Sequence, residues 1–208
     1  MNRRAVFLDR DGVINRYYFD NEQGVLATPF SPRNFKLLPK VGEAIARLNR
    51  LGYAAVVASN QPGVAKGQFN LKNLKQMDRK LKSQLHKTGA KLDRIYYCLH
   101  HPQEGKLPYR KSCSCRKPKA GLLLQAAGDL KINLKKSYMV GDSITDIQAG
   151  KKVGCKTVLI HKYKCDLCQF LQEKKVKPDF IAEDLYQAVQ IISKQEGKNG
   201  IIHRYRRR

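Results

Sequence analysis

Long hydrophobic runs are missing from this chain of 208 residues. None approaches the ~20 consecutive apolar residues that a transmembrane helix needs. The N-terminal residues enter a strand-like segment almost at once, without the apolar core or the small-residue cleavage site of a secretory signal. We therefore expect a cytoplasmic protein without membrane association, and our working expectation is a monomer.

Acidic residues are scarce, because 17 Asp and Glu stand against 41 Lys and Arg, and the formal net charge is +24. Such a charge attracts phosphorylated metabolites, nucleic acid or an anionic membrane surface. A solvated basic surface without a particular partner fits equally well, so composition leaves these alternatives open. The basic residues are densest at the C-terminus, where we expect a tail over residues 196–208.

Internal repeats and low-complexity linkers are absent too, so the length and the 42% hydrophobic content predict a single domain over residues 1–195. Strand-like and helix-like segments alternate along it. We expect strands at 5–8, 53–58, 92–97, 137–140, 157–160 and 179–182, and helices at 41–51, 71–87, 119–128, 144–153 and 184–194. This order predicts an α/β fold, with helices on both faces of a parallel sheet. Residues 15–39 are expected to form a long functional loop.

The first predicted strand ends in two carboxylates and a glycine, Asp9-Arg10-Asp11-Gly12. Ligands of parallel sheets bind outside the carboxyl ends of the strands. Two carboxylates this close repel each other, and a divalent cation relieves that repulsion. The pair can supply a nucleophile, a group for proton transfer and a seat for Mg²⁺, although an ordinary Asp-Gly turn is the plain alternative.

Three further polar groups follow later segments of the chain. The second strand runs into Ser59-Asn60, Lys117 precedes a predicted helix, and the fourth strand runs into Gly141-Asp142. A hydroxyl and an ammonium can bind a phosphoryl group, and a carboxylate at residue 142 would complete an oxygen shell for Mg²⁺. Asp146, one turn further, could hold the loop. Each signal alone also fits a turn or a surface lysine, but their order makes them jointly informative.

These positions resemble the four sequence motifs of the haloacid-dehalogenase-like phosphohydrolases. The resemblance implies a Rossmann-like fold and hydrolysis of a phosphate monoester through an aspartyl-phosphate. By motif position, Asp9 would be the nucleophile and Asp11 the general acid and base, while Ser59 and Lys117 would stabilise the transferring phosphoryl group. The same resemblance implies that Mg²⁺ is bound by Asp9, the main chain of Asp11, and Asp142.

A cysteine-rich insertion occupies residues 98–115. In a cytosolic chain, clustered cysteines favour a metal over disulfides. Cys98-x-His100 and Cys113-x-Cys115 offer three thiolates and an imidazole, the donors of a closed tetrahedral Zn²⁺ site. A loop of this length with little apolar content needs such an anchor. The C-x-x-C pair Cys165 and Cys168 is read as incidental thiols rather than as a second metal or redox site. Cys155 is predicted to lie in the core.

The insertion is similar to that of the D-glycero-D-manno-heptose-1,7-bisphosphate 7-phosphatases. This resemblance selects His100 over His101 as the zinc ligand. It also implies that Arg116 recognises the substrate's remaining phosphate and that Asn60 and Gln61 lie in the substrate loop. The expected substrate is thus a small phosphorylated sugar.

Two other activities stay open. The histidinol-phosphate phosphatases carry a related but shorter insertion. A phosphatase acting on the 3′ ends of nucleic acid would suit the positive charge, but the sequence contains no nucleic-acid-binding module. A binding protein without catalytic activity would not need both Asp9 and Asp11.

Overall fold

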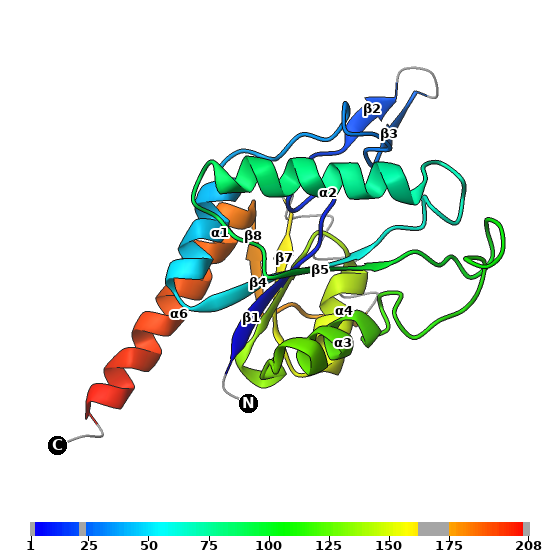
Figure 1. The fold of residues 1–208 in the computed structure, drawn as a ribbon. Coiled ribbons are helices and arrows are strands. Elements are labelled where there is room, and N and C mark those ends of the chain that lie inside the picture. The colour runs from blue at the N-terminus through cyan, green and yellow to red at the C-terminus, as the bar shows by residue number, and fades with distance from the viewer. Residues whose placement is uncertain (1–2, 21–23, 162–174, 206–208) are drawn as a thin grey trace.

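A computed structural model describes residues 3–20, 24–161 and 175–205, with the side chains beyond residue 197 left aside (Figure 1). The first half contains β1 (Arg4–Leu8), β2 (Tyr18–Asp20), β3 (Val25–Ala27), α1 (Val41–Arg50), β4 (Tyr53–Asn60), α2 (Leu71–His86) and β5 (Arg94–Cys98). The second half contains α3 (Gly121–Leu130), the 3₁₀ turn η1 (Leu134–Lys136), β6 (Tyr138–Gly141), α4 (Ile144–Lys152), β7 (Lys156–Ile160), β8 (Phe180–Ala182) and α6 (Leu185–Tyr205).

Six of the strands form one sheet in the order β5-β4-β1-β6-β7-β8, and every neighbouring pair is parallel. β1 is central, with β4 on one side and β6 on the other. The strand order therefore reverses at β1, and in open α/β sheets this is the point where the carboxyl ends leave a crevice for a ligand. The predicted parallel α/β architecture is confirmed.

Helices cover both faces of this sheet (Figure 1). The apolar stripes of α1, α2 and α6 pack into one buried cluster, whereas α3 packs into a second cluster on the opposite face. Successive residues of β1 alternate between the two, since Val6 and Leu8 belong to the first cluster and Ala5 and Phe7 to the second. Burial on both faces explains why the strand reads as an unbroken apolar run.

The predicted loop at 15–39 contains a small antiparallel pair, β2 and β3, that the sequence pattern does not predict. Strands of three residues are too short to show an alternating pattern. Aromatic contacts with residues outside the two strands stabilise the pair. The Tyr18 ring packs edge-on against Phe30 with the ring centroids 5.9 Å apart, and Phe30 stacks on Phe69 at the same centroid distance.

The last helix is longer than predicted, because α6 continues past residue 194 to Tyr205. Glu196 explains part of the extension. Its carboxylate accepts hydrogen bonds from the Tyr53 hydroxyl at 2.7 Å and from Arg4, which fix this turn to the sheet. Cys155 is buried, as predicted, whereas Cys165 and Cys168 lie outside the described residues. Among the helices in the described ranges, none has both the length and the apolar character required to cross a bilayer.

Candidate active site and metal-binding cluster

Three carboxylates converge at the carboxyl ends of the central strands. Asp9 follows β1, Asp142 follows β6, and Asp146 lies in the first turn of α4; one oxygen from each falls within 4.8 Å of the others. The approach is close because Gly12 has a positive φ of 80° and no side chain, and a Cβ there would lie 1.9 Å from Asp142 Oδ2. The local D-x-D-G sequence thus permits the two loops to meet.

Lys117 is the cation of this group, and its side chain is buried. The ammonium lies 3.0 Å from Asp9 Oδ1 and 2.5 Å from Asp146 Oδ1, and it donates to the carbonyl of Ala58 at 2.8 Å. Burial alone would lower the pKa of Lys117, but Asp146 and Asp9 outweigh this effect and raise it. The lysine therefore stays charged and fixed between two strand ends.

One ammonium does not balance the three carboxylates. Burial, followed by repulsion from Asp9, raises the pKa of Asp142 to about 6. Burial raises the pKa of Asp146 to about 7, although Lys117 opposes the shift. The Tyr17 hydroxyl donates to Asp142 Oδ2 at 3.0 Å. A cluster of oxygen ligands with excess negative charge is a suitable site for a hard divalent cation such as Mg²⁺.

Asp146 also organises the loop that carries Asp142. Its Oδ2 accepts a hydrogen bond from the main-chain N–H of Ser143 at 3.1 Å. The Ser143 side chain in turn accepts from the main-chain N–H of Thr145 and so caps the N-terminus of α4. Gly141 leaves room for this arrangement, because a Cβ at that position would lie 2.2 Å from the Asp146 side chain. The loop-holding role predicted for Asp146 is confirmed, and its pairing with Lys117 adds a second role.

Asp11 does not join the carboxylate cluster. Its buried side chain accepts from Asn15 Nδ2 at 2.8 Å, from Gln61 Nε2 at 2.6 Å and from Arg10 Nη2, which lies 3.2 Å from each carboxylate oxygen. These three side chains fix the orientation of the Asp11 carboxylate. The sequence pattern assigns no role to Arg10, which lies within the D-x-D-G stretch, or to Asn15, which follows it by three residues.

The polar residues that end β4 contact the same network. Ser59 is buried, and its hydroxyl accepts from Gln61 Nε2 at 3.1 Å. The Asn60 amide accepts from the N–H of Lys117 at 3.0 Å and donates to the carbonyl of that residue at 3.1 Å. Both amides predicted for the substrate loop therefore have partners within the protein: Asn60 holds the lysine main chain, and Gln61 holds Asp11.

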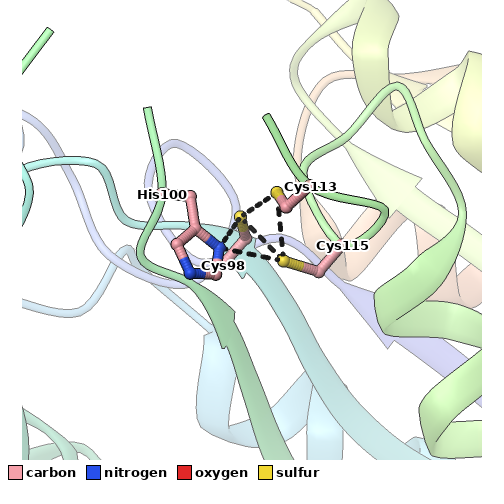
Figure 2. Close-up of side chains that lie close together, drawn as sticks. All are labelled: Cys98, His100, Cys113 and Cys115. Atoms are coloured by element: carbon pink, nitrogen blue, oxygen red, sulfur yellow. Dashed lines mark hydrogen bonds between the residues drawn. The ribbon is translucent and has the colours of Figure 1, made fainter. Parts of the chain in front are cut away.

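The four predicted zinc ligands come together at the base of the insertion (Figure 2). The three pairs of sulfur atoms among Cys98, Cys113 and Cys115 are 3.1–3.5 Å apart, and His100 Nδ1 lies 3.4 and 3.8 Å from two of them. Tetrahedral Zn²⁺ separates thiolates by roughly 3.8 Å and a thiolate from an imidazole by about 3.6 Å. Burial lowers the pKa of His100, which favours the neutral ring that a metal requires.

The neighbouring histidine has a different environment. His101 Nδ1 accepts from the main-chain N–H of Glu104 at 2.8 Å, and its Nε2 lies 3.4 Å from the Glu104 carboxylate. Arg116 donates to the carbonyl of His100 at 3.2 Å, so the insertion holds this arginine directly before Lys117. The cluster and the carboxylate site are thereby joined through three consecutive residues, 115–117.

Sequence comparison finds relatives that match most of this chain. A family model described as HAD-hydrolase-like matches residues 114–188. The D-glycero-beta-D-manno-heptose-1,7-bisphosphate 7-phosphatase of Haemophilus ducreyi is 36% identical over 195 residues, covering 93% of this chain and all of the relative. The protein of the same name from Photorhabdus laumondii is 40% identical over 157 residues, covering 74% of this chain and 79% of the relative.

Structural comparison agrees with the sequence relatives. The crystal structure of D,D-heptose 1,7-bisphosphate phosphatase from B. bronchiseptica, complexed with magnesium and phosphate, superposes with a TM-score of 0.76. It is 30% identical in sequence, and the match covers 92% of this chain and 99% of that one. An ion and an anion of the expected kinds are thus named for a protein with this fold and a related sequence.

Proposed function

This chain belongs to the family of the D-glycero-beta-D-manno-heptose-1,7-bisphosphate 7-phosphatases, which are haloacid-dehalogenase-like hydrolases, and from this membership we propose that it hydrolyses the 7-phosphate of a D-glycero-D-manno-heptose 1,7-bisphosphate. The observation that carries the proposal is the convergence of Asp9, Asp142, Asp146 and Lys117 at the carboxyl ends of the central strands. Phosphoryl transfer requires mainly positioning and charge neutralisation, and these side chains supply both.

Magnesium fits the carboxylate cluster. Asp9, Asp142 and the main chain of Asp11 would hold it, because three close carboxylates and one ammonium leave negative charge uncompensated. Bound Mg²⁺ would neutralise charge on the phosphoryl oxygens during transfer. Zinc fits the second cluster, where four protein ligands leave no open position and imply a structural role.

The remaining chemistry belongs to the protein's own residues. The carboxylate of Asp9 attacks phosphorus, and the bond from phosphorus to the sugar oxygen breaks as Asp11 donates a proton to that oxygen. Asp11 then takes a proton from a water molecule that attacks the aspartyl-phosphate, which releases inorganic phosphate and restores Asp9. Lys117 and the Ser59 hydroxyl stabilise the negative charge of the transferring group.

We propose that the zinc-anchored insertion determines which substrate is bound. Arg116 lies beside the catalytic lysine and carries a planar guanidinium that suits a second phosphate. The substrate is accordingly a small phosphorylated sugar. The cytoplasmic location and the monomeric state remain predictions from sequence.

The direct test is phosphate release in the presence of Mg²⁺ from heptose 1,7-bisphosphate, histidinol phosphate and a 3′-phosphorylated oligonucleotide. We expect kcat/KM to be highest for the heptose. Preference for histidinol phosphate would retain the mechanism and reassign the substrate. Preference for the oligonucleotide would show that the net positive charge, and not the insertion, determines the substrate.

A further inference from the structure

Arg10 is a fully buried guanidinium between the two predicted catalytic aspartates. Its Nη2 donates hydrogen bonds to the Asp11 carboxylate and to Gln61 Oε1, the latter at 2.9 Å. Its Nε and Nη1 have no hydrogen-bond acceptor among the described residues. A buried charge with so few hydrogen bonds needs other compensation.

Tyr97 provides part of that compensation. The Arg10 guanidinium carbon lies 5.6 Å from the centroid of the Tyr97 ring, within the range of a cation–π contact. The Tyr97 hydroxyl donates to Asp78 Oδ1 at 2.6 Å. A phenol that donates to a carboxylate has a more electron-rich ring, so this bond strengthens the attraction of the ring for the guanidinium.

Asp78 is the end of this chain of contacts and the only acidic residue in α2. The exposed face of the same helix carries Lys72, Lys75, Arg79 and Lys82, whereas Asp78 points inward to Tyr97. Burial raises the pKa of Asp78, and the Tyr97 hydroxyl and the Arg10 charge oppose the rise. The single carboxylate of a basic helix is therefore directed at the network behind the active site.

We propose that Arg10, Tyr97 and Asp78 are positioning residues, a chain of contacts that holds the carboxyl group of Asp11 where it transfers a proton. Asp78 compensates the charge of Arg10 through Tyr97, and Arg10 in turn orients Asp11. The inference rests on the proposed function, because it concerns the group that protonates the leaving sugar oxygen. None of the three residues needs to contact the substrate.

The test separates proton transfer from phosphoryl transfer by the leaving group. An alkyl ester such as the heptose phosphate leaves as a poor alkoxide and needs an acid, whereas 4-nitrophenolate leaves readily without one. For Tyr97→Phe and Asp78→Asn we expect kcat/KM to fall about tenfold on the heptose ester and less than about twofold on 4-nitrophenyl phosphate. Both substitutions preserve shape, and Tyr97→Phe keeps the ring over Arg10.

Tyr96 supplies a matched control on the same strand. Its hydroxyl donates to Asp129 Oδ2 at 2.9 Å, but its ring packs into the cluster on the opposite face of the sheet. Tyr96→Phe therefore removes an equivalent tyrosine–aspartate bond without affecting Arg10. We expect this variant to retain wild-type kcat/KM on both esters.

Several results would overturn the inference. Equal losses on the two esters would show that Tyr97 and Asp78 act only on general stability, and unchanged kinetics would show that they do not act on Asp11. A fall in kcat/KM for Tyr96→Phe as large as that for Tyr97→Phe would show that the effect is not specific to the contact with Arg10. Wild-type protein inactive on both esters would instead contradict the proposed function, and with it this inference.

Discussion

At the scale of single residues, the sequence predicts where a site residue lies in the fold better than it predicts which side chains that residue contacts. Asp9, Lys117 and Asp142 were expected at one site because each follows a strand or precedes a helix on the same edge, and the structure brings them together. The hydrogen bonds of Asn60 and Gln61 were not foreseen. Side-chain partners depend on rotamers and on loops that are distant in sequence, and no local pattern encodes them.

The charge imbalance at Asp142 leads to a prediction about pH. Its pKa is raised to about 6 in the folded, metal-free protein, above the ordinary value of 3.8, so the folded state binds this proton more tightly than the unfolded state. Ionising Asp142 therefore costs stability as pH rises through 6, and Mg²⁺ removes that cost only when the carboxylate is ionised. We expect the rise in Tm caused by Mg²⁺ to be larger at pH 7.5 than at pH 5.

Thermal unfolding with and without Mg²⁺ at the two pH values measures this difference. Asp142→Asn serves as the reference, since it removes the titrating group and should lose most of the Mg²⁺ effect at both. An equal rise in Tm at pH 5 and pH 7.5 in the wild type would contradict the account.

Arg116 carries a prediction about recognition. If it binds the second phosphate, Arg116→Ala should raise KM for the heptose bisphosphate by about tenfold, because a charge-assisted contact is lost, and should leave KM for a heptose 7-monophosphate nearly unchanged. Arg110→Ala is the control, since it removes the same charge from an exposed position of the same insertion. Equal effects of Arg116→Ala on both substrates would exclude this role.

At the scale of elements, long periodic helices and buried strands were predictable, and short or anchored segments were not. The stripe of Leu74, Met77, Leu81 and Leu85 marks α2 plainly, and all four side chains are buried. The pair β2 and β3 and the extra turns of α6 depend on tertiary contacts, such as those of Glu196 with Arg4 and Tyr53. Such contacts override local propensity.

The insertion at 98–115 leads to a prediction about how metal binding affects catalysis. Cys115 lies two residues before Lys117, so loss of the proposed zinc ion should displace the proposed catalytic lysine as well as Arg116. We expect Cys115→Ser to lower zinc content well below the ~1 ion per chain of a structural site and to reduce kcat by roughly tenfold or more.

Metal analysis and steady-state kinetics on the same samples test this coupling. Cys155→Ala is the matched variant, because it removes a buried cysteine that belongs to the core and not to the cluster. Full activity in a Cys115→Ser protein that has lost its metal would contradict the link between the two sites.

At the scale of the whole molecule, the parallel sheet, its helical layers and the position of the site all follow from the alternation of elements. The carboxylate cluster lies at the carboxyl ends of β1 and β6, where β1 has β4 on one side and β6 on the other. The net charge of +24 is consistent with attraction of a doubly phosphorylated substrate but does not select it. We propose instead that Arg116 and the insertion that holds it select the substrate.

The central claim is that Asp9 attacks the 7-phosphate of the heptose bisphosphate and leaves the 1-phosphate in place. The most direct measurement is ³¹P NMR of the reaction with Mg²⁺, run in parallel with Asp9→Asn. We predict that the 7-phosphate resonance is replaced by inorganic phosphate while the 1-phosphate resonance persists, and that the variant shows no change. Release of the 1-phosphate, or turnover by Asp9→Asn, would contradict the account.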